Sequence, residues 1–333
     1  MITPLVMLQH LASQRIQLNF HIDVVGFGDE EGTRFGSTLL GSSAVAGVWD
    51  SSWADLTDDS GTTLANAFIH FGLDVNNISD AAITSNEVIA YIEAHIEQGP
   101  ILEDTNQSLA PVKGIAGAKR YDISLTGHAG HAGTVPMNMR NDPLVVAAQW
   151  ISEVYLQACE LNQQENNVVA TVGKIDVSPG AVNVIPGEVH LSLDVRSLDN
   201  ALRDRLIDTL KVCLDNLAES NHLNLEWKQT HHADAVACNE GLTSLLGKAI
   251  DSVQGSSSSL VSGAGHDAMV FAGKVPTAMM FVRCKKGISH HPLESIAVED
   301  ATKAIQALMS SILAIQCDSN VESSNDSSVE MGL

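Results

Sequence analysis

The stretch between residues 118 and 229 constrains the fold most, because its apolar pattern changes repeatedly between a strand period and a helix period. Apolar and polar residues alternate at the two clearest strands, and an amphipathic helical pattern follows each of them. The expected elements are a strand at 121–126, a helix at 144–159, strands at 168–177 and 189–196, a helix at 202–217 and a strand at 223–227. The order β-α-β-β-α-β predicts a ferredoxin-like α+β domain that could fold by itself.

Two aspartates support the helix boundaries within this stretch. Asp142 stands directly before Pro143, which favours the first turn of a helix, and Asp199 can cap the second helix.

The sequence on either side has a different character. Short apolar runs, typical of strands buried on both faces, alternate with helical patterns, and this predicts an α/β sheet. The runs lie at 20–27, 91–96, 259–262 and 277–282, and the helical patterns include 62–71 and 298–315. We therefore expect one α/β domain (1–117 and 230–317) interrupted by the inserted domain (118–229). The Ser-, Asn- and Asp-rich segment 318–333 is expected to be a disordered tail.

Composition limits the binding partners that we expect and indicates the cellular compartment. Lys and Arg number 18 against 40 Asp and Glu, a net charge of −22, so nucleic acids and anionic membranes are not expected partners. No segment has the length of a membrane span, and the first residues lack the positive start of a secretory signal. The five cysteines form no CxxC pair, which favours reduced thiols and a cytoplasmic location.

Polar clusters follow several strands of the expected α/β domain, where open sheets gather their sites. Glu30 and Glu31 follow the first strand, His95 ends the second, and His290 and His291 follow the strand at 277–282. Paired glutamates beside histidines suit a divalent metal, because one carboxylate can bind the ion while the other accepts a proton from water. Taken singly, each cluster is equally consistent with a solvated turn, a strand end or a surface loop.

The inserted domain carries a second group of polar residues. The Gly- and Ala-rich loop 127–134 holds the imidazoles of His128 and His131, and glycines there allow close approach to a ligand. Arg196 has the planar fork that binds a carboxylate, and Asn183 offers an amide.

Two alternatives remain open for these polar groups. Arg196 could instead form a surface ion pair with Asp194 or Asp199. The Gly-rich turn 262–267, which is expected to open a helix at His266, could cradle an anion or be a simple turn.

Six motifs in this order resemble the hydantoinase/carbamoylase amidases, a family that includes allantoate amidohydrolases, N-carbamoyl-L-amino acid hydrolases and β-ureidopropionases. The motifs are FGDEEGTRF at 27–35, HIEQGP at 95–100, HAGTVPM at 131–137, NVIPG at 183–187, SGAGHDA at 262–268 and GISH at 287–290. The resemblance runs from about Leu5 to Ile315, and the run around Glu30 looks most like allantoate amidohydrolases.

The resemblance implies a metallopeptidase-like catalytic domain with two divalent ions (Mn²⁺, Zn²⁺ or Co²⁺) and an inserted lid domain that forms a homodimer. It makes Glu30 the general base, Glu31 and His290 ligands of one metal, and His95 a ligand of the second. His131 and His266 would join Glu30 as catalytic residues, with His131 reaching the partner subunit's site. The implied substrate contacts are Gln98, His131, Asn183, Arg196, Gly263, Ala264 and His266.

The sequence also departs from the family pattern. The family has a leading portion with a His-x-Asp motif and a later Asp that bridges the two metals, and neither is expected in this chain. His21-Ile22-Asp23 imitates the motif, but it lies in the run leading directly into Glu30, and we interpret it as ordinary strand sequence. One metal then keeps only His95, whereas a catalytic zinc usually has three protein ligands. Missing strands should also expose an apolar sheet edge.

Three hypotheses about function follow. The first is a hydrolase in which metal-activated water attacks the ureido carbonyl of allantoate or of an N-carbamoyl amino acid, with Glu30 moving the proton. The second is an aminoacylase or dipeptidase of the same superfamily. Through the resemblance, Asn183 and Arg196 favour the first hypothesis over this one. The third is a truncated, metal-poor fragment or pseudoenzyme that only dimerises, which a start codon placed too late would explain.

Overall fold

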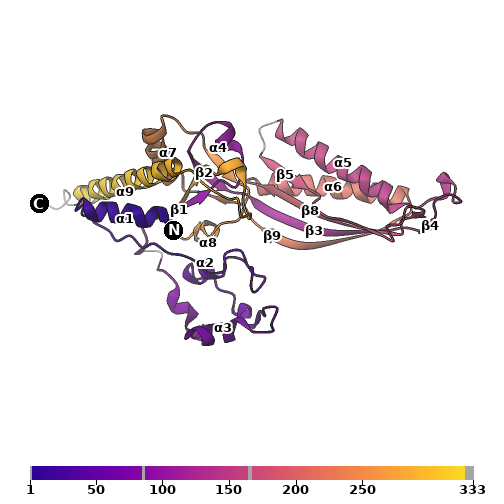
Figure 1. Cartoon of the computed structure of the whole chain (residues 1–333), viewed down its shortest axis with the longest axis horizontal. Coiled ribbons are helices and arrows are strands. Elements are labelled where there is room, and N and C mark those ends of the chain that lie inside the picture. Colours follow the sequence, from indigo (N-terminus) through magenta and orange to yellow (C-terminus); the bar gives the residue numbers. More distant parts are fainter. Residues whose placement is uncertain (1, 85–86, 164–166, 327–333) are drawn as a thin grey trace, which may run out of the picture. The chain divides into compact units, whose positions relative to one another are not determined.

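The computed structural model describes residues 2–84, 87–163 and 167–326, with side chains described as far as residue 316 (Figure 1). The chain divides into two compact units, of which unit 1 comprises Met1–Ile115 and Ala237–Leu333 and unit 2 comprises Ala116–Val236. The middle of the chain thus forms its own unit, and the flanking segments combine in the other. Unit 2 ends later than residue 229 because its last strand continues to Ala233.

Unit 1 is built on a mixed five-stranded sheet in the order β1-β12-β2-β10, with β11 paired to β2. The strands are β1 (Tyr91–Ile96), β2 (Leu109–Ile115), β10 (Val236–Ala237), β11 (Leu260–Ser262) and β12 (Thr277–Val282). β12 runs parallel to β1 and antiparallel to β2, and all of its residues are buried, as its apolar sequence requires. β1 is at an edge of this sheet, and its residues are half-buried.

The described helices of unit 1 are α1 (Ile2–Ser13), α2 (Leu40–Val45), α3 (Leu64–Phe71), α4 (Ile101–Asp104), α7 (Glu240–Gln254), α8 (Ala268–Phe271) and α9 (Val298–Asp326), with 3₁₀ turns η1 (Ser51–Asp55), η2 (Val75–Ala81) and η5 (Lys285–Gly287). Helices α7, α8 and α9 pack on the sheet. Helices α1 and α9 lie side by side (Figure 1), and Leu11, Ile250 and Leu308 share one core cluster with Met280 of β12.

Two parts of unit 1 differ from the expectation. The run 20–27 is coil rather than strand. None of the strands in the described part of the chain pairs with it, and Ile22 packs instead against the core of α1 and α9. His21 and Asp23 are exposed in this coil.

The second difference concerns the chain's last segment. Helix α9 continues to Asp326 instead of giving way to a disordered tail at 318, since no proline or glycine interrupts its sequence. The rest of the expected tail, 327–333, lies outside the described residues.

Apart from the short strands β4 and β7, unit 2 has the element order β-α-β-β-β-α-β, because the run 168–177, which was expected to be one strand, forms two. Its strands are β3 (Gly117–Thr126), β5 (Val168–Thr171), β6 (Ile175–Ser178), β8 (Glu188–Ser197) and β9 (Asn224–Ala233), in the order β5-β8-β3-β9 with β6 also paired to β8. The pairings are antiparallel. A separate two-stranded sheet joins β4 (Gly130–His131) to β7 (Val184–Ile185), and a 3₁₀ turn, η4, spans Met137–Met139.

Helices α5 (Pro143–Asn162) and α6 (Asn200–Ser220) cover one face of the unit 2 sheet (Figure 1). Both begin where the sequence predicts. Asp142 accepts a hydrogen bond from the Leu144 amide at 3.0 Å, and Asp199 accepts bonds from the amides of Ala201 and Leu202. Trp150 is fully buried between helices and sheet, where its indole N–H donates to the carbonyl of Leu210.

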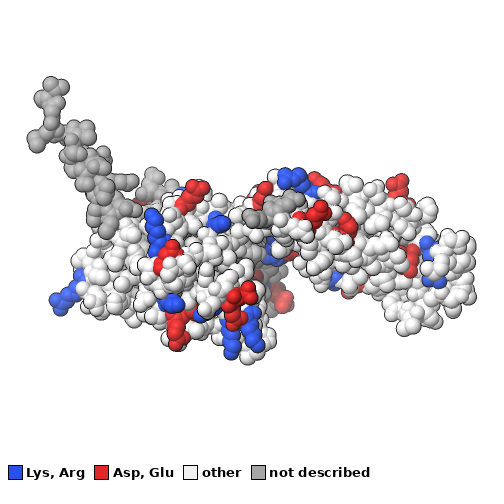
Figure 2. All heavy atoms as spheres, turned by 90° about the horizontal axis from the view of Figure 1, so that it is seen from above, with Lys and Arg blue, Asp and Glu red and all other residues white. Residues whose placement is uncertain are grey.

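The surface carries charges of both signs. On the face seen in Figure 2, acidic and basic side chains are interspersed among uncharged ones. Within the described residues, no helix is both long and apolar enough to cross a membrane.

Candidate metal and active site

An open pocket of about 670 Å³ in unit 1 collects residues from three distant parts of the sequence. Its lining includes Glu31, Thr33, His95, Gln98, Ser289 and His290. The motifs at 27–35, 95–100 and 287–290 therefore meet at one place. Four residues that the sequence assigns to the site, Glu31, His95, Gln98 and His290, are among those that line it.

Two loops of the pocket are held together by specific contacts. Gln98 donates its side-chain amide to the hydroxyl of Ser289 at 2.9 Å. Gly287 has φ +63°, and a Cβ there would stand 2.6 Å from the carbonyl carbon of Gly99. Only glycine allows the two backbones to approach this closely.

Three residues other than glycine around the pocket adopt left-handed backbone conformations. Asp29, Gln98 and His290 have φ values of 54°, 56° and 56°. Such conformations cost free energy in residues with a Cβ, and they are concentrated at binding and catalytic sites. Their position next to Glu30 and in the pocket wall points to a functional site here.

Glu31 and His290 face each other across the pocket. Oε1 of Glu31 lies 3.3 Å from Nε2 of His290, and both side chains are more than half exposed, 55% and 63%. An exposed ion pair of this kind adds little to stability. Ligands about 2.0–2.1 Å from a tetrahedral zinc lie about 3.3 Å apart, so the separation suits two ligands of one cation.

Glu30 lies half-buried beside this pair. Burial, followed by the negative charges of Glu31, Asp267 and Glu93, raises the pKa of its carboxyl group to about 7. A carboxylate with a pKa near neutrality can both accept and return a proton under working conditions, as general base catalysis requires.

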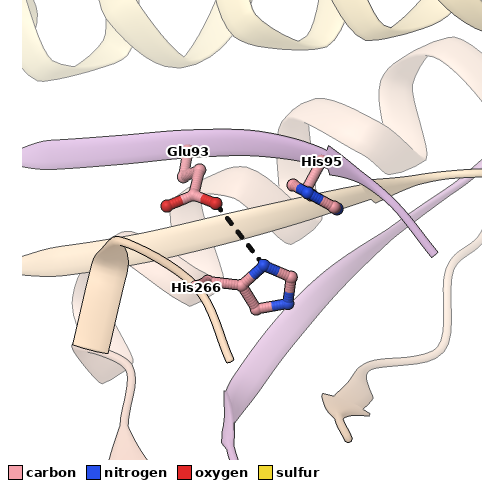
Figure 3. A group of neighbouring side chains, drawn as sticks. All are labelled: Glu93, His95 and His266. Atoms are coloured by element: carbon pink, nitrogen blue, oxygen red, sulfur yellow. Dashed lines mark ion pairs between the residues drawn. The ribbon is translucent and has the colours of Figure 1, made fainter. Parts of the chain in front are cut away.

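A second group of potential ligands lies close to His95. Glu93, His95 and His266 each turn a nitrogen or oxygen atom toward the others (Figure 3), and these atoms all lie within 4.8 Å of one another. Glu93 and His95 are two positions apart in β1 and so lie on one face of the sheet. The sequence reasoning missed Glu93, although this two-residue spacing from His95 was the signal that could have found it.

His266 is the most deeply buried of the three, with 2% exposure. Burial, together with the nearby His95, lowers the pKa of its ring to about 3, so the ring is neutral. Its Nε2 lies 2.6 Å from Oγ of Ser262, and its Nδ1 lies 3.7 Å from Oε1 of Glu93.

The Gly-rich turn before α8 binds a carboxylate of the protein itself. Helix α8 begins at Ala268, not at His266, and the Ala268 amide donates to Oε2 of Glu93 at 3.0 Å. The amide of Ala264 donates to Ser262, and Gly263 is exposed. Of the two alternatives for this turn, an anion cradle or a simple turn, the contact of the Ala268 amide with Glu93 favours the first, with a carboxylate of the protein as the anion.

The remaining predicted site residues belong to unit 2. His131 and Asn183 are neighbours on the β4–β7 sheet, where the Ala132 amide donates to the Asn183 carbonyl at 2.9 Å, and both are exposed. Arg196 binds Asp194 through Nε and Nη2, each at 2.8 Å. The ion-pair alternative for Arg196 therefore holds, with Asp194 as its partner.

Unit 2 does not bring these three residues together. His131 and Asn183 lie beyond the Glu188 end of β8, and Arg196 lies near the other end. Eight residues of strand, at about 3.3 Å each, separate the ends by about 26 Å. One copy of unit 2 cannot present all three side chains to one small molecule.

Known proteins resemble this chain over nearly its whole length. The family model described as Peptidase family M20/M25/M40 matches residues 2–314. The chain belongs to this family. Within the M20 family, it is 36% identical over 318 residues to a probable allantoate deiminase of Oryza sativa subsp. japonica, covering 87% of this chain and 65% of that protein.

Other M20 relatives carry related names. An N-carbamoyl-L-amino-acid amidohydrolase of Pseudomonas sp. (strain NS671) is 36% identical, with 91% of this chain and 74% of that protein covered. A solved hydantoinase/carbamoylase family amidase from Burkholderia multivorans has a TM-score of 0.87 at 30% identity, covering 93% of this chain and 74% of that one. The chain spans less than two thirds of the length of the allantoate deiminases of Oryza sativa and Arabidopsis thaliana, 65% and 61%.

The donors in unit 1 fit the divalent metals on which the M20 family depends. Imidazole and carboxylate are the ligands that Zn²⁺, Mn²⁺ and Co²⁺ accept in proteins. Within the part of the chain that the structure describes, Glu93, His95 and His266 are the group of three such side chains with converging atoms. His21 and Asp23 are not part of it.

Proposed function

We propose that this M20 chain is a metal-dependent amidohydrolase that cleaves a ureido or carbamoyl C–N bond, with allantoate or an N-carbamoyl amino acid as substrate. The observation that carries the proposal is the unit 1 pocket, in which Glu31, His95, Gln98 and His290 meet beside Glu30. The names of the relatives, allantoate deiminase and N-carbamoyl-L-amino-acid amidohydrolase, support the substrate class.

The metal roles follow from the contacts in the pocket. Glu31 and His290 would hold one divalent cation, and His95 would hold a second. Each cation would be Mn²⁺, Zn²⁺ or Co²⁺. A bound cation of this type polarises a carbonyl group and lowers the pKa of water.

Glu30 is the proton carrier in this proposal. Its carboxylate accepts a proton from the attacking water and later delivers it to the leaving nitrogen, so that the carbamoyl group departs as ammonia and carbon dioxide. The raised pKa of Glu30 supports this role, because the group is available in both protonation states near pH 7.

Substrate recognition would fall mainly to unit 2, which acts as a lid. Arg196 would bind the substrate carboxylate through its guanidinium, which Asp194 orients, and Asn183 and His131 would bind ureido oxygens. Gln98, Gly263 and Ala264 would contribute from unit 1. Because Arg196 and His131 lie at opposite ends of unit 2, we further propose a homodimer in which His131 serves the partner subunit's site.

The test is hydrolysis of a panel of substrates by the Mn²⁺-loaded chain. Ammonia release reports cleavage of ureido and carbamoyl substrates, and release of a free α-amino group reports cleavage of acetyl and peptide substrates. The proposal predicts ammonia release from allantoate or N-carbamoyl amino acids and little cleavage of an N-acetyl amino acid or a dipeptide. Faster cleavage of the acetyl or peptide substrates would favour an aminoacylase or dipeptidase. No cleavage of any substrate by folded, metal-loaded protein would favour the inactive, dimerising fragment.

A further inference from the structure

We propose that Glu93, His95 and His266 together bind one divalent cation. This rests on the proposed function and deepens it, because it adds two ligands to the metal for which the resemblance assigns only His95 in this sequence. It gives that ion three protein ligands from the described residues. It also replaces the substrate contact implied for His266, since a side chain with 2% exposure offers little surface to a substrate.

The spacing of the three side chains suits a cation better than it suits direct contacts. Nδ1 of His266 and Oε1 of Glu93 are 3.7 Å apart, which is longer than a hydrogen bond. Two ligands of a tetrahedral zinc lie about 3.3 Å apart. The two atoms face each other (Figure 3), and a separation shorter by about 0.4 Å would suit two ligands of one tetrahedral ion.

The hydrogen bonds of His266 leave its cluster-facing nitrogen as the lone-pair atom. The Ser262 hydroxyl has one proton, which it donates to the Ala264 carbonyl at 3.1 Å. With the Ser262 proton on the Ala264 carbonyl, Nε2–H of His266 is the donor in the 2.6 Å contact between Ser262 and His266. In this tautomer the ring turns an unprotonated Nδ1 toward Glu93.

The other two residues are oriented in the same way. Nδ1 of His95 lies 2.8 Å from the Ile96 carbonyl and must donate to it, which leaves Nε2 as the lone-pair nitrogen. Oε2 of Glu93 accepts bonds from the Tyr91 hydroxyl at 2.9 Å and the Ala268 amide at 3.0 Å, and Oε1 faces His266. Each residue thus has one atom held by an outer contact and one turned inward, the usual arrangement behind metal ligands.

The donor set also selects the class of metal. Two imidazoles and one carboxylate suit Zn²⁺, Co²⁺ or Mn²⁺, whereas Ca²⁺ and Mg²⁺ prefer oxygen ligands. His95 also lines the open pocket of unit 1, so a fourth position on the ion can face a small molecule there. Three protein ligands with one open position are typical of a catalytic zinc.

The experiment measures binding of Zn²⁺ and Co²⁺ to the full chain by calorimetry, after removal of metal with a chelator. The His290→Ala variant removes a surface ligand of the other proposed cation and should still bind one ion per chain. In that background, Glu93→Gln and His266→Asn should each weaken binding at least about tenfold, and the visible absorption of bound Co²⁺ should change. Glu226→Gln and His70→Asn, which change exposed residues, serve as matched controls.

Two outcomes would overturn the inference. One is that the His290→Ala variant binds no cation. The other is that Glu93→Gln and His266→Asn bind the cation as tightly as the controls do. Circular dichroism in chelator verifies that each variant folds, and Glu93→Asp, which keeps the carboxylate, should bind with intermediate affinity if His266→Asn does not fold. Binding is measured without substrate, so loss of ammonia release with intact cation binding would count against the proposed function alone.

Discussion

Two features raise the pKa of the Glu30 carboxyl group toward the range that suits a general base. They are its partial burial and the nearby negative charges. The sequence predicts a free carboxylate at this position from the adjacent Glu31. It could not predict the raised pKa, because Glu93 and Asp267 come from segments far away in the chain. The same holds for His266, whose contact with Glu93 depends on how β1 and the turn before α8 meet.

The pKa of Glu30 predicts a pH dependence of stability in the metal-free protein. The folded state holds this proton more tightly than the unfolded state, whose pKa is near 4.5. The stabilising contribution is therefore complete below about pH 4.5 and is lost as the pH rises through about 7. Urea unfolding in chelator should show a flatter pH dependence for Glu30→Gln than for wild type.

The matched control for this prediction is Glu226→Gln, which removes an exposed carboxylate of unit 2. Its pH dependence should follow that of wild type. Equal slopes for wild type and Glu30→Gln between pH 4.5 and 7 would contradict the raised pKa.

At the scale of helices, strands and loops, local patterns predicted unit 2 better than unit 1. The strands β3 and β8 and the caps at Asp142 and Asp199 depend on nearby residues, and the sequence places them correctly. The run 20–27 has the same apolar character as a strand, but a strand also needs a neighbour. Pairing is not encoded in the run itself, so the prediction was wrong.

Gly287→Ala should disrupt the pocket, because the new Cβ would collide with the backbone of Gly99 and φ is +63°. We expect a loss of more than about 1 kcal/mol in the free energy of unfolding and weaker cation binding at Glu31 and His290. Gly61→Ala is the control, since Gly61 also has a positive φ but open space around it. Equal effects of the two substitutions on cation binding would show that the close approach to Gly99 has no role.

Asp199→Ala should destabilise the chain by about 1 kcal/mol, because the amides of Ala201 and Leu202 lose their acceptor. Asp208→Ala, in the exposed middle of α6, should be neutral or slightly stabilising. Thermal unfolding of both variants checks this, and a neutral Asp199→Ala would mean that the cap does not limit the stability of α6.

At the scale of the whole molecule, net charge and exposed apolar side chains act in opposite directions. A charge of −22 makes two copies repel each other, whereas α5 exposes Tyr155 at 67% and Leu156 at 58%. Association through unit 2 would cover such side chains, and salt would screen the repulsion.

Light scattering should therefore give twice the chain mass of 35.4 kDa, with the dimer strengthened by added salt. Leu156→Lys should weaken the dimer more than Asn216→Lys, which places the same charge on α6. A monomer at all salt concentrations would contradict the homodimer and the role of His131 in the partner subunit's site.

In the proposed mechanism, Glu30 carries protons in a metal site without binding the metal. The most direct test compares wild type with Glu30→Gln in one preparation, with metal content measured by elemental analysis after Mn²⁺ loading and ammonia release measured on allantoate. We expect the variant to retain its metal and to lose ammonia release. An equal loss of metal would make Glu30 a ligand, and ammonia release as fast as that of wild type would remove it from the mechanism.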